Sequence, residues 1–131
     1  MQKCAAGFVV VDIYIDYDIY IFMKLLSFFA GSRDDYMGFP ASIRNKAGFQ
    51  LDRVQRGLEP EDWKPMTIIG SGVKEVRIKD VSGAYRVIYV VSFAEAVFVL
   101  HAFQKKSQQT PKRDIDLAVQ RYKDLARSLK K

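Results

Sequence analysis

Side chains suited to phosphate and base chemistry recur at alternate positions in three segments, 73–79, 85–93 and 97–105, that the sequence predicts as β-strands. They are Glu75, Arg77, Lys79, Arg86, His101, Phe103, Lys105 and, just beyond the third strand, Lys106. Arginine and lysine bind phosphate, imidazole titrates near neutral pH, and aromatic rings stack on bases. Because side chains alternate along a strand, a favourable register would place this set on one face of a sheet. Such a mixture is typical of RNA recognition.

Each of these residues also has a simpler structural interpretation. A charged strand face is commonly just the solvated side of a sheet, which covers Arg77 and Lys79. His101 at a strand end is often a structural hydrogen bonder, and Phe103 beside an apolar strand is often core. Arg86 interrupts an apolar run, and an unpaired buried charge is costly, so it must face solvent, a ligand or Glu75.

The remaining segments predict the elements that carry these strands. Two prolines and two glycines mark 59–72 as a loop, and Gly70-Ser71-Gly72 lacks the lysine and helix of a phosphate-binding loop. Ser32 is expected to cap a short helix through Asp34 and Asp35. The full expected order is a strand at 24–29, that short helix, a helix from Phe39-Pro40 to 58, the three strands, and a helix opening at Thr110-Pro111. This order predicts an α+β fold: a small, mostly antiparallel sheet with the N-terminal helices on one face, the other face at least partly open, and a C-terminal helix.

Length and composition narrow the possible functions. The chain has 131 residues, enough for one domain, and a net charge of +6 from 21 basic and 15 acidic residues. A small basic protein favours a polyanionic partner, whether RNA, DNA or an acidic protein, although the excess charge can also serve solubility alone. A single cysteine and a single histidine exclude an intramolecular disulfide and a conventional structural zinc site. A reducing cytoplasm fits this composition best.

Residues 1–22 form an unusual N-terminal extension. From Val9 to Ile21, apolar residues at odd positions alternate with Asp12, Asp16 and Asp18, which is the pattern of a strand. The apolar run at 5–11 is too short to span a bilayer. Three interpretations stay open: an extra edge strand, a strand exchanged in a homodimer, or an artefact of start-site choice, with the domain itself beginning at Met23.

From Met23 to the end, the sequence resembles the phage-derived branch of the RelE/HigB toxin superfamily. The most telling motifs are Lys64-Pro65-Met66, Glu75-x-Arg77, the Tyr85–Tyr89 segment Tyr-Arg-Val-Ile-Tyr, and the Leu100–Lys106 segment Leu-His-Ala-Phe-Gln-Lys-Lys. The resemblance implies the toxin of a type II toxin–antitoxin pair. Such a toxin enters the ribosomal A site and cleaves mRNA there, and its partner is a helix-turn-helix antitoxin.

The resemblance also implies roles for individual residues. Arg86 matches the family's arginine at the scissile phosphate, and Arg77, with Lys79 on the same face, matches the basic strand residues of the catalytic groove. Lys105 matches a basic residue at the end of the last strand. His101, Glu75 or Lys105 would transfer protons, while Lys79, Phe103 and Lys106 would contact RNA. The reaction would proceed by 2′-OH attack, without a metal or cofactor. Glu75 stands where some relatives have lysine, and the tyrosine that some relatives use near the C-terminus has no secure match, since Tyr122 lies on an apolar helix stripe.

Other functions compete with this one on the same residues. A non-catalytic nucleic-acid-binding module needs only the basic, aromatic face. An inactive toxin relative would keep the fold as a regulatory subunit. A peptide-binding domain for an acidic helix fits less well alone, although it could describe the contact with an antitoxin.

Overall fold

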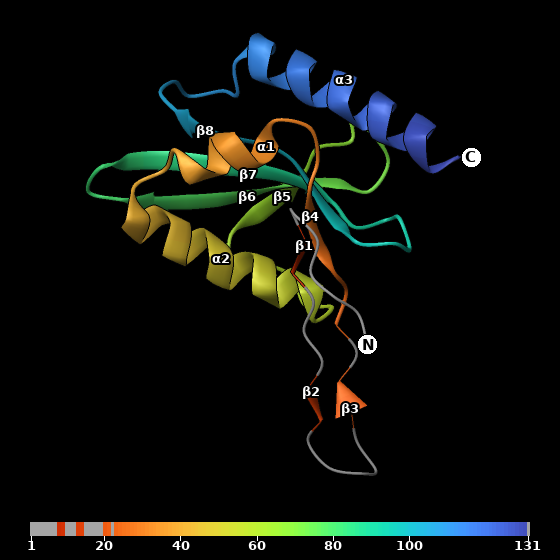
Figure 1. Ribbon diagram of the computed structural model, residues 1–131. Coiled ribbons are helices and arrows are strands. Elements are labelled where there is room, and N and C mark those ends of the chain that lie inside the picture. The colour runs from red at the N-terminus through yellow and green to blue at the C-terminus, as the bar shows by residue number, and fades with distance from the viewer. Residues whose placement is uncertain (1–7, 10–12, 15–19, 22, 131) are drawn as a thin grey trace.

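The computed structural model describes residues 8–9, 13–14, 20–21 and 23–130, and it shows an α+β fold (Figure 1). This confirms the predicted fold class. The helices are α1 (Ser32–Met37), α2 (Ala41–Gln55) and α3 (Lys112–Leu129). The principal strands are β4 (Leu26–Phe28), β5 (Trp63–Pro65), β6 (Val73–Asp80), β7 (Gly83–Val90) and β8 (Val97–Lys105).

The main sheet has the order β1-β4-β8-β7-β6-β5, and the β4–β8 pair is its only parallel pair among the described residues. β1 (Phe8–Val9) pairs with the outer edge of β4. β2 (Ile13–Tyr14) and β3 (Tyr20–Ile21) form a separate two-stranded antiparallel sheet. Most of the extension predicted as a strand or exchanged strand falls on residues 1–7, 10–12, 15–19 and 22, outside the described residues.

Helices lie on both faces of the sheet, with α2 and α3 on opposite sides in Figure 1. α2 buries Ile43, Ala47 and Leu51 in a core shared with Val76 and Val87. α3 closes a second core over the opposite face, containing Ala118 and Leu125 among other residues. The face expected to be partly open is therefore covered along part of its length by the C-terminal helix.

A bulge in β8 sets which side chains lie beneath α3. Tyr89 pairs with Val99 and Ile88 pairs with His101, so Leu100 is the extra residue in β8. Leu100 belongs to the core under α3, and His101 contacts α3 as well. The bulge therefore lets β8 present two successive side chains to the same helix.

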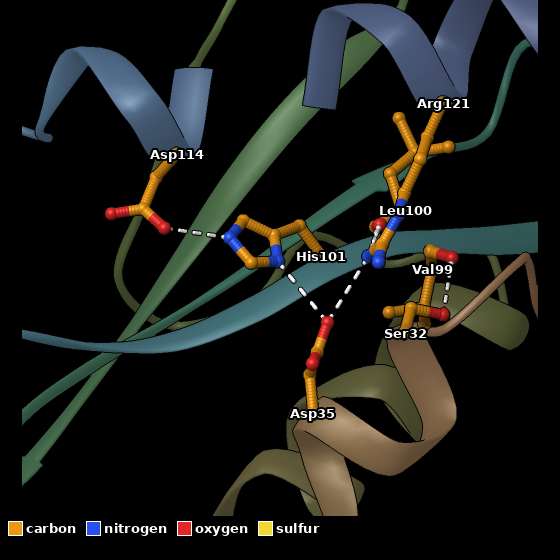
Figure 2. A network of polar contacts seen from close by, with 7 residues as sticks. All are labelled: Ser32, Asp35, Val99, Leu100, His101, Asp114 and Arg121. Atoms are coloured by element: carbon orange, nitrogen blue, oxygen red, sulfur yellow. Dashed lines mark hydrogen bonds and ion pairs between the residues drawn. The ribbon is translucent and has the colours of Figure 1, made fainter. Parts of the chain in front are cut away.

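The ends of the helices follow the sequence with one exception. Pro40 precedes α2, and Gly57, with φ of 86°, follows it where the Leu58 N–H donates back to the Arg53 carbonyl. The expectation that Ser32 caps α1 is wrong. Its buried hydroxyl donates instead to the Val99 carbonyl at 2.9 Å, tying α1 to β8 (Figure 2). A buried hydroxyl needs a partner, and the adjacent strand supplies one.

Candidate functional site

The register of β6, β7 and β8 brings the predicted residues onto one face of the sheet. Arg77 lies directly opposite Arg86, and Arg86 lies opposite Phe103. One pair further along, Lys79 and Lys105 flank Ala84 from the two sides. Residues directly opposite one another in antiparallel strands point to the same face. The side chains that gather near one end of the three strands are therefore those of Arg77, Lys79, Arg86 and Lys105.

Glu75 and Arg86 form the buried part of this site. The Glu75 side chain has no exposed surface, and 11% of the Arg86 side chain is exposed. Arg86 Nε lies 3.4 Å from Glu75 Oε1, an ion pair without the alignment of a hydrogen bond. The Thr110 hydroxyl, just before α3, donates to Glu75 Oε2 at 3.0 Å. The start of α3 and the arginine together hold a carboxylate that would be costly to bury alone.

The two facing arginines keep donor capacity that the described residues do not use. The Nε atoms of Arg77 and Arg86 are buried without a hydrogen-bond partner, although Arg86 Nη1 donates to the Tyr85 carbonyl. Arg77 Nη1 lies 3.8 Å from Asp62 Oδ1, too far for a hydrogen bond. Like charges directly opposite in a sheet repel each other. An anion with several acceptor oxygens, bound beside the two guanidinium groups, would relieve the repulsion.

Two lysines complete this arrangement. Burial, and then the positive charge of Arg86, lower the pKa of Lys105 below its usual value. Lys64 on β5 lies directly opposite Glu75, and its charge also lowers the Lys105 pKa. Sequence reasoning did not include Lys64 in the site because 59–72 was predicted to be a loop. Its place in the Lys64-Pro65-Met66 motif was the available signal. We call Lys64, Arg77, Arg86 and Lys105 the cationic cluster.

An open hollow of about 580 Å³ lies beside the cationic cluster. Arg86 and Lys105 line it together with Lys106, Ser107 and Gln108, which follow the last residue of β8. Lys106 is exposed, as a residue contacting a flexible polyanion would be. The hollow therefore borders two members of the cationic cluster, Arg86 and Lys105.

His101 occupies a different environment, clamped between two carboxylates (Figure 2). Its Nε2 lies 2.7 Å from Asp114 Oδ1 of α3, and its Nδ1 lies 3.3 Å from Asp35 Oδ2 of α1. Arg121 Nη1 donates to the same Asp35 oxygen at 3.1 Å and to the Leu100 carbonyl at 2.9 Å. The His101 side chain is 7% exposed. This network joins α1, β8 and α3, and it leaves neither ring nitrogen of His101 open to a substrate.

Phe103 is half-buried between the cationic cluster and the hydrogen-bond network of His101. Its ring stacks on His101 with centroids 4.9 Å apart and packs against the core under α3. The face that the histidine covers is not available to a base. Phe103 and His101 share the predicted side of the sheet, yet their contacts are those of structural residues.

No group of three or more potential metal-ligating side chains occurs in the part of the chain that the structure describes. Within the same residues, none of the helices combines the length and apolar character needed to cross a bilayer.

Comparison with known proteins gives one family. The family model described as phage-derived protein Gp49-like (DUF891) matches residues 34–123, which include the cationic cluster, Glu75 and His101. No curated protein matches the chain.

Proposed function

Because the chain belongs to the Gp49-like family of phage-derived proteins, which is part of the RelE/HigB-like toxin superfamily, we propose that it is a toxin that cleaves mRNA in the ribosomal A site. The proposal makes it the toxin of a type II toxin–antitoxin system, acting in the cytoplasm as a ribosome-dependent endoribonuclease. A cognate helix-turn-helix antitoxin would neutralise it.

The observation that carries the proposal is the direct pairing of Arg77 with Arg86 beside the lowered-pKa Lys105. The two facing arginines repel each other, and an anion bound beside both would offset that repulsion. A phosphodiester has the charge and the acceptor geometry to bridge them. The neighbouring lysine adds a group whose proton can be removed more readily than that of an ordinary lysine.

The proposed reaction uses the 2′-OH of the mRNA as its nucleophile. Neutral Lys105 takes the 2′-OH proton, the 2′-oxygen bonds to the adjacent phosphorus, and the bond to the 5′-oxygen breaks. Arg77 and Arg86 stabilise the added negative charge in the transition state. The leaving 5′-oxygen takes a proton from solvent or from a second cation of the cluster. The products are a 2′,3′-cyclic phosphate and a 5′-OH end.

Glu75 and His101 serve this mechanism as positioning residues. Glu75 forms an ion pair with the Arg86 guanidinium, and its other carboxylate oxygen accepts a hydrogen bond from Thr110. His101 fixes the start of α3 through Asp114, so it keeps Thr110 in place. Proton transfer is assigned to Lys105 because it lines the open hollow, whereas both of these residues are buried.

The ribosome supplies what this small site lacks. Holding a substrate in a reactive geometry contributes large rate factors, and the A site would hold the codon against the cationic cluster. The +6 net charge favours association with ribosomal RNA through phosphate contacts. The antitoxin would act by covering the basic face or by keeping the toxin away from the ribosome.

Induced expression followed by mapping of mRNA ends tests the proposal. We expect the wild-type chain to arrest growth and to produce cuts within A-site codons, both from Met1 and from Met23, and the adjacent antitoxin gene to prevent both effects. Arg86→Lys keeps the charge but loses the planar fork, so cleavage should fall at least tenfold. Arg113→Lys, the same exchange at an exposed arginine of α3, is the matched control and should cleave normally. Binding to ribosomes without cuts would indicate a non-catalytic nucleic-acid module, and harmless expression an inactive relative; either would contradict the proposal.

A further inference from the structure

A second groove lies along the edge of β6, next to the cationic cluster. β5 pairs with β6 through Lys74–Val76, and the Arg77 N–H then donates to the Asp62 carbonyl. Beyond that bond, the described residues place no strand on this edge of β6. The edge, α2 and residues 61–62 enclose a groove of about 520 Å³. Arg77 lines this groove and also belongs to the cationic cluster, so the groove and the cluster share a residue.

An aromatic ring lies in this groove without a role in the core. Phe49 of α2 lines the groove and is 55% exposed. A single exposed apolar residue needs no explanation by itself. Here, however, the ring stands among cations, with Lys46 on the same helix and Lys79 on β6 lining the same groove. An aromatic platform interleaved with cations is the arrangement that binds single-stranded nucleic acid.

Two acidic residues also line the groove, and one of them has a hydrogen-bond partner. Glu61 accepts from the Gln50 amide at 3.0 Å, and its own N–H donates to the Gln50 side-chain oxygen at 2.8 Å. Asp62 lies 3.8 Å from Arg77. Three cations, Lys46, Arg77 and Lys79, outnumber the two carboxylates by one, so the groove keeps a small positive balance. A flat base can therefore enter without its attached phosphates meeting net repulsion.

We propose that this groove is a nucleobase subsite, in which a base next to the phosphate held by the cationic cluster stacks on Phe49. The inference rests on the proposed function, because it takes the RNA strand to lie across Arg77. The strand would pass over the edge of β6 from the face under α3 to the α2 side. The subsite would then hold one base unstacked from its neighbours, and its Watson–Crick edge would point toward the polar groups of residues 61–62.

Fluorescence anisotropy with short single-stranded RNA tests the subsite. Fully 2′-O-methylated strands prevent cleavage during the measurement. A series with one abasic position moved along the strand identifies which base contributes. The full-length chain is compared with Phe49→Ala, with Phe49→Trp, and with Ile68→Ala, a control that shortens another exposed apolar residue, 71% exposed, which does not line the groove. A strand with 5-iodouridine at the responsive position adds a photo-crosslink readout.

For the wild type, we expect one abasic position to weaken binding about 5- to 160-fold, the range for loss of one stacked base. Phe49→Ala should bind the intact strand as weakly as the wild type binds that abasic strand. Phe49→Trp should retain the preference, and Ile68→Ala should match the wild type. The crosslink should map to Phe49.

Three outcomes would overturn the subsite. They are no dependence on any single base, equal affinity of Phe49→Ala and wild type for the intact strand, or equal weakening of intact and abasic strands by Phe49→Ala. The third outcome would point to a contact other than a base, such as an acidic protein helix. If Phe49→Ala behaves as expected while Arg86→Lys still cleaves mRNA at the wild-type rate, the catalytic assignment fails and the subsite stands. If only Arg86→Lys behaves as expected, the subsite alone fails.

Discussion

Replacing Arg86 with methionine removes the cation that pairs with the fully buried Glu75. The carboxylate keeps the Thr110 hydroxyl, but its Oε1 has no other partner. Removing one partner of a buried ion pair typically costs about 3–5 kcal/mol. The 3.4 Å separation and imperfect alignment place this pair at the lower end, so we expect a loss of about 3 kcal/mol. For a domain of this length, that loss corresponds to a fall in Tm of about 10 °C.

Thermal and urea unfolding followed by circular dichroism measure this loss. The control is the double variant Arg86→Met/Glu75→Met, which removes both charges and should recover most of the lost stability without recovering cleavage. If Arg86→Met unfolds at the wild-type temperature, or if adding Glu75→Met recovers none of the lost stability, Arg86 does not stabilise the Glu75 carboxylate.

Lys105, His101 and Gly70 each give a further prediction. Lys105→Met should lower cleavage about 10²- to 10⁴-fold. The wild-type cleavage rate should rise with pH as Lys105 loses its proton. The rise should come at a lower pH than for an unperturbed lysine, because burial and the neighbouring Arg86 lower the Lys105 pKa. A pH–rate profile without this rise would refute Lys105 as the general base. His101→Ala leaves two carboxylates without their shared partner, so it should lower the free energy of unfolding, measured in urea, by about 2–4 kcal/mol. The folded variant should still cleave within about tenfold of wild type. Loss of cleavage without loss of stability would instead make His101 a catalytic residue. Gly70→Ala places a methyl group against the Tyr122 ring and should lower the free energy of unfolding by about 1–3 kcal/mol. Gly48→Ala inside α2 should leave stability unchanged or raise it. Equal melting temperatures of the two variants would contradict the contact between Gly70 and Tyr122.

The shared face of the three central strands was predictable from sequence because it depends only on local alternation and short connections. Asp80–Gly83 makes a tight turn, which fixes Arg77 opposite Arg86. The same alternation placed Phe103 beside Arg86, and the bulge at Leu100 lies on the far side of His101, so it did not disturb the match. The residue pairing that carries the proposed function was therefore accessible from the sequence.

Burial within that face was not predictable, because it depends on contacts distant in sequence. Glu75 looks like a solvated charge in an alternating strand, but Thr110, 35 residues later, covers it. His101 is enclosed by Asp35, 66 residues earlier, and by Asp114. Both contacts depend on how α1 and α3 pack against β8, which the amphipathic patterns of the helices do not specify.

The short strand β5 was also missed, for a local reason. The segment around it contains two prolines and many polar residues, which favour a loop. Its three residues form a strand because the edge of β6 offers unpaired backbone groups to them. That pairing brings Lys64 into the cationic cluster, and it leaves the rest of the β6 edge open for the proposed subsite.

The most direct test of the central claim uses ribosomes programmed with a short mRNA whose A-site codon carries either ribose or a single 2′-deoxyribose at the cut position. The account predicts that the wild-type protein cuts the all-ribose mRNA to leave a 5′-OH end and a 2′,3′-cyclic phosphate, and that the 2′-deoxy mRNA stays intact at that position. Cleavage of the 2′-deoxy mRNA at the same bond, or of neither mRNA, would contradict it.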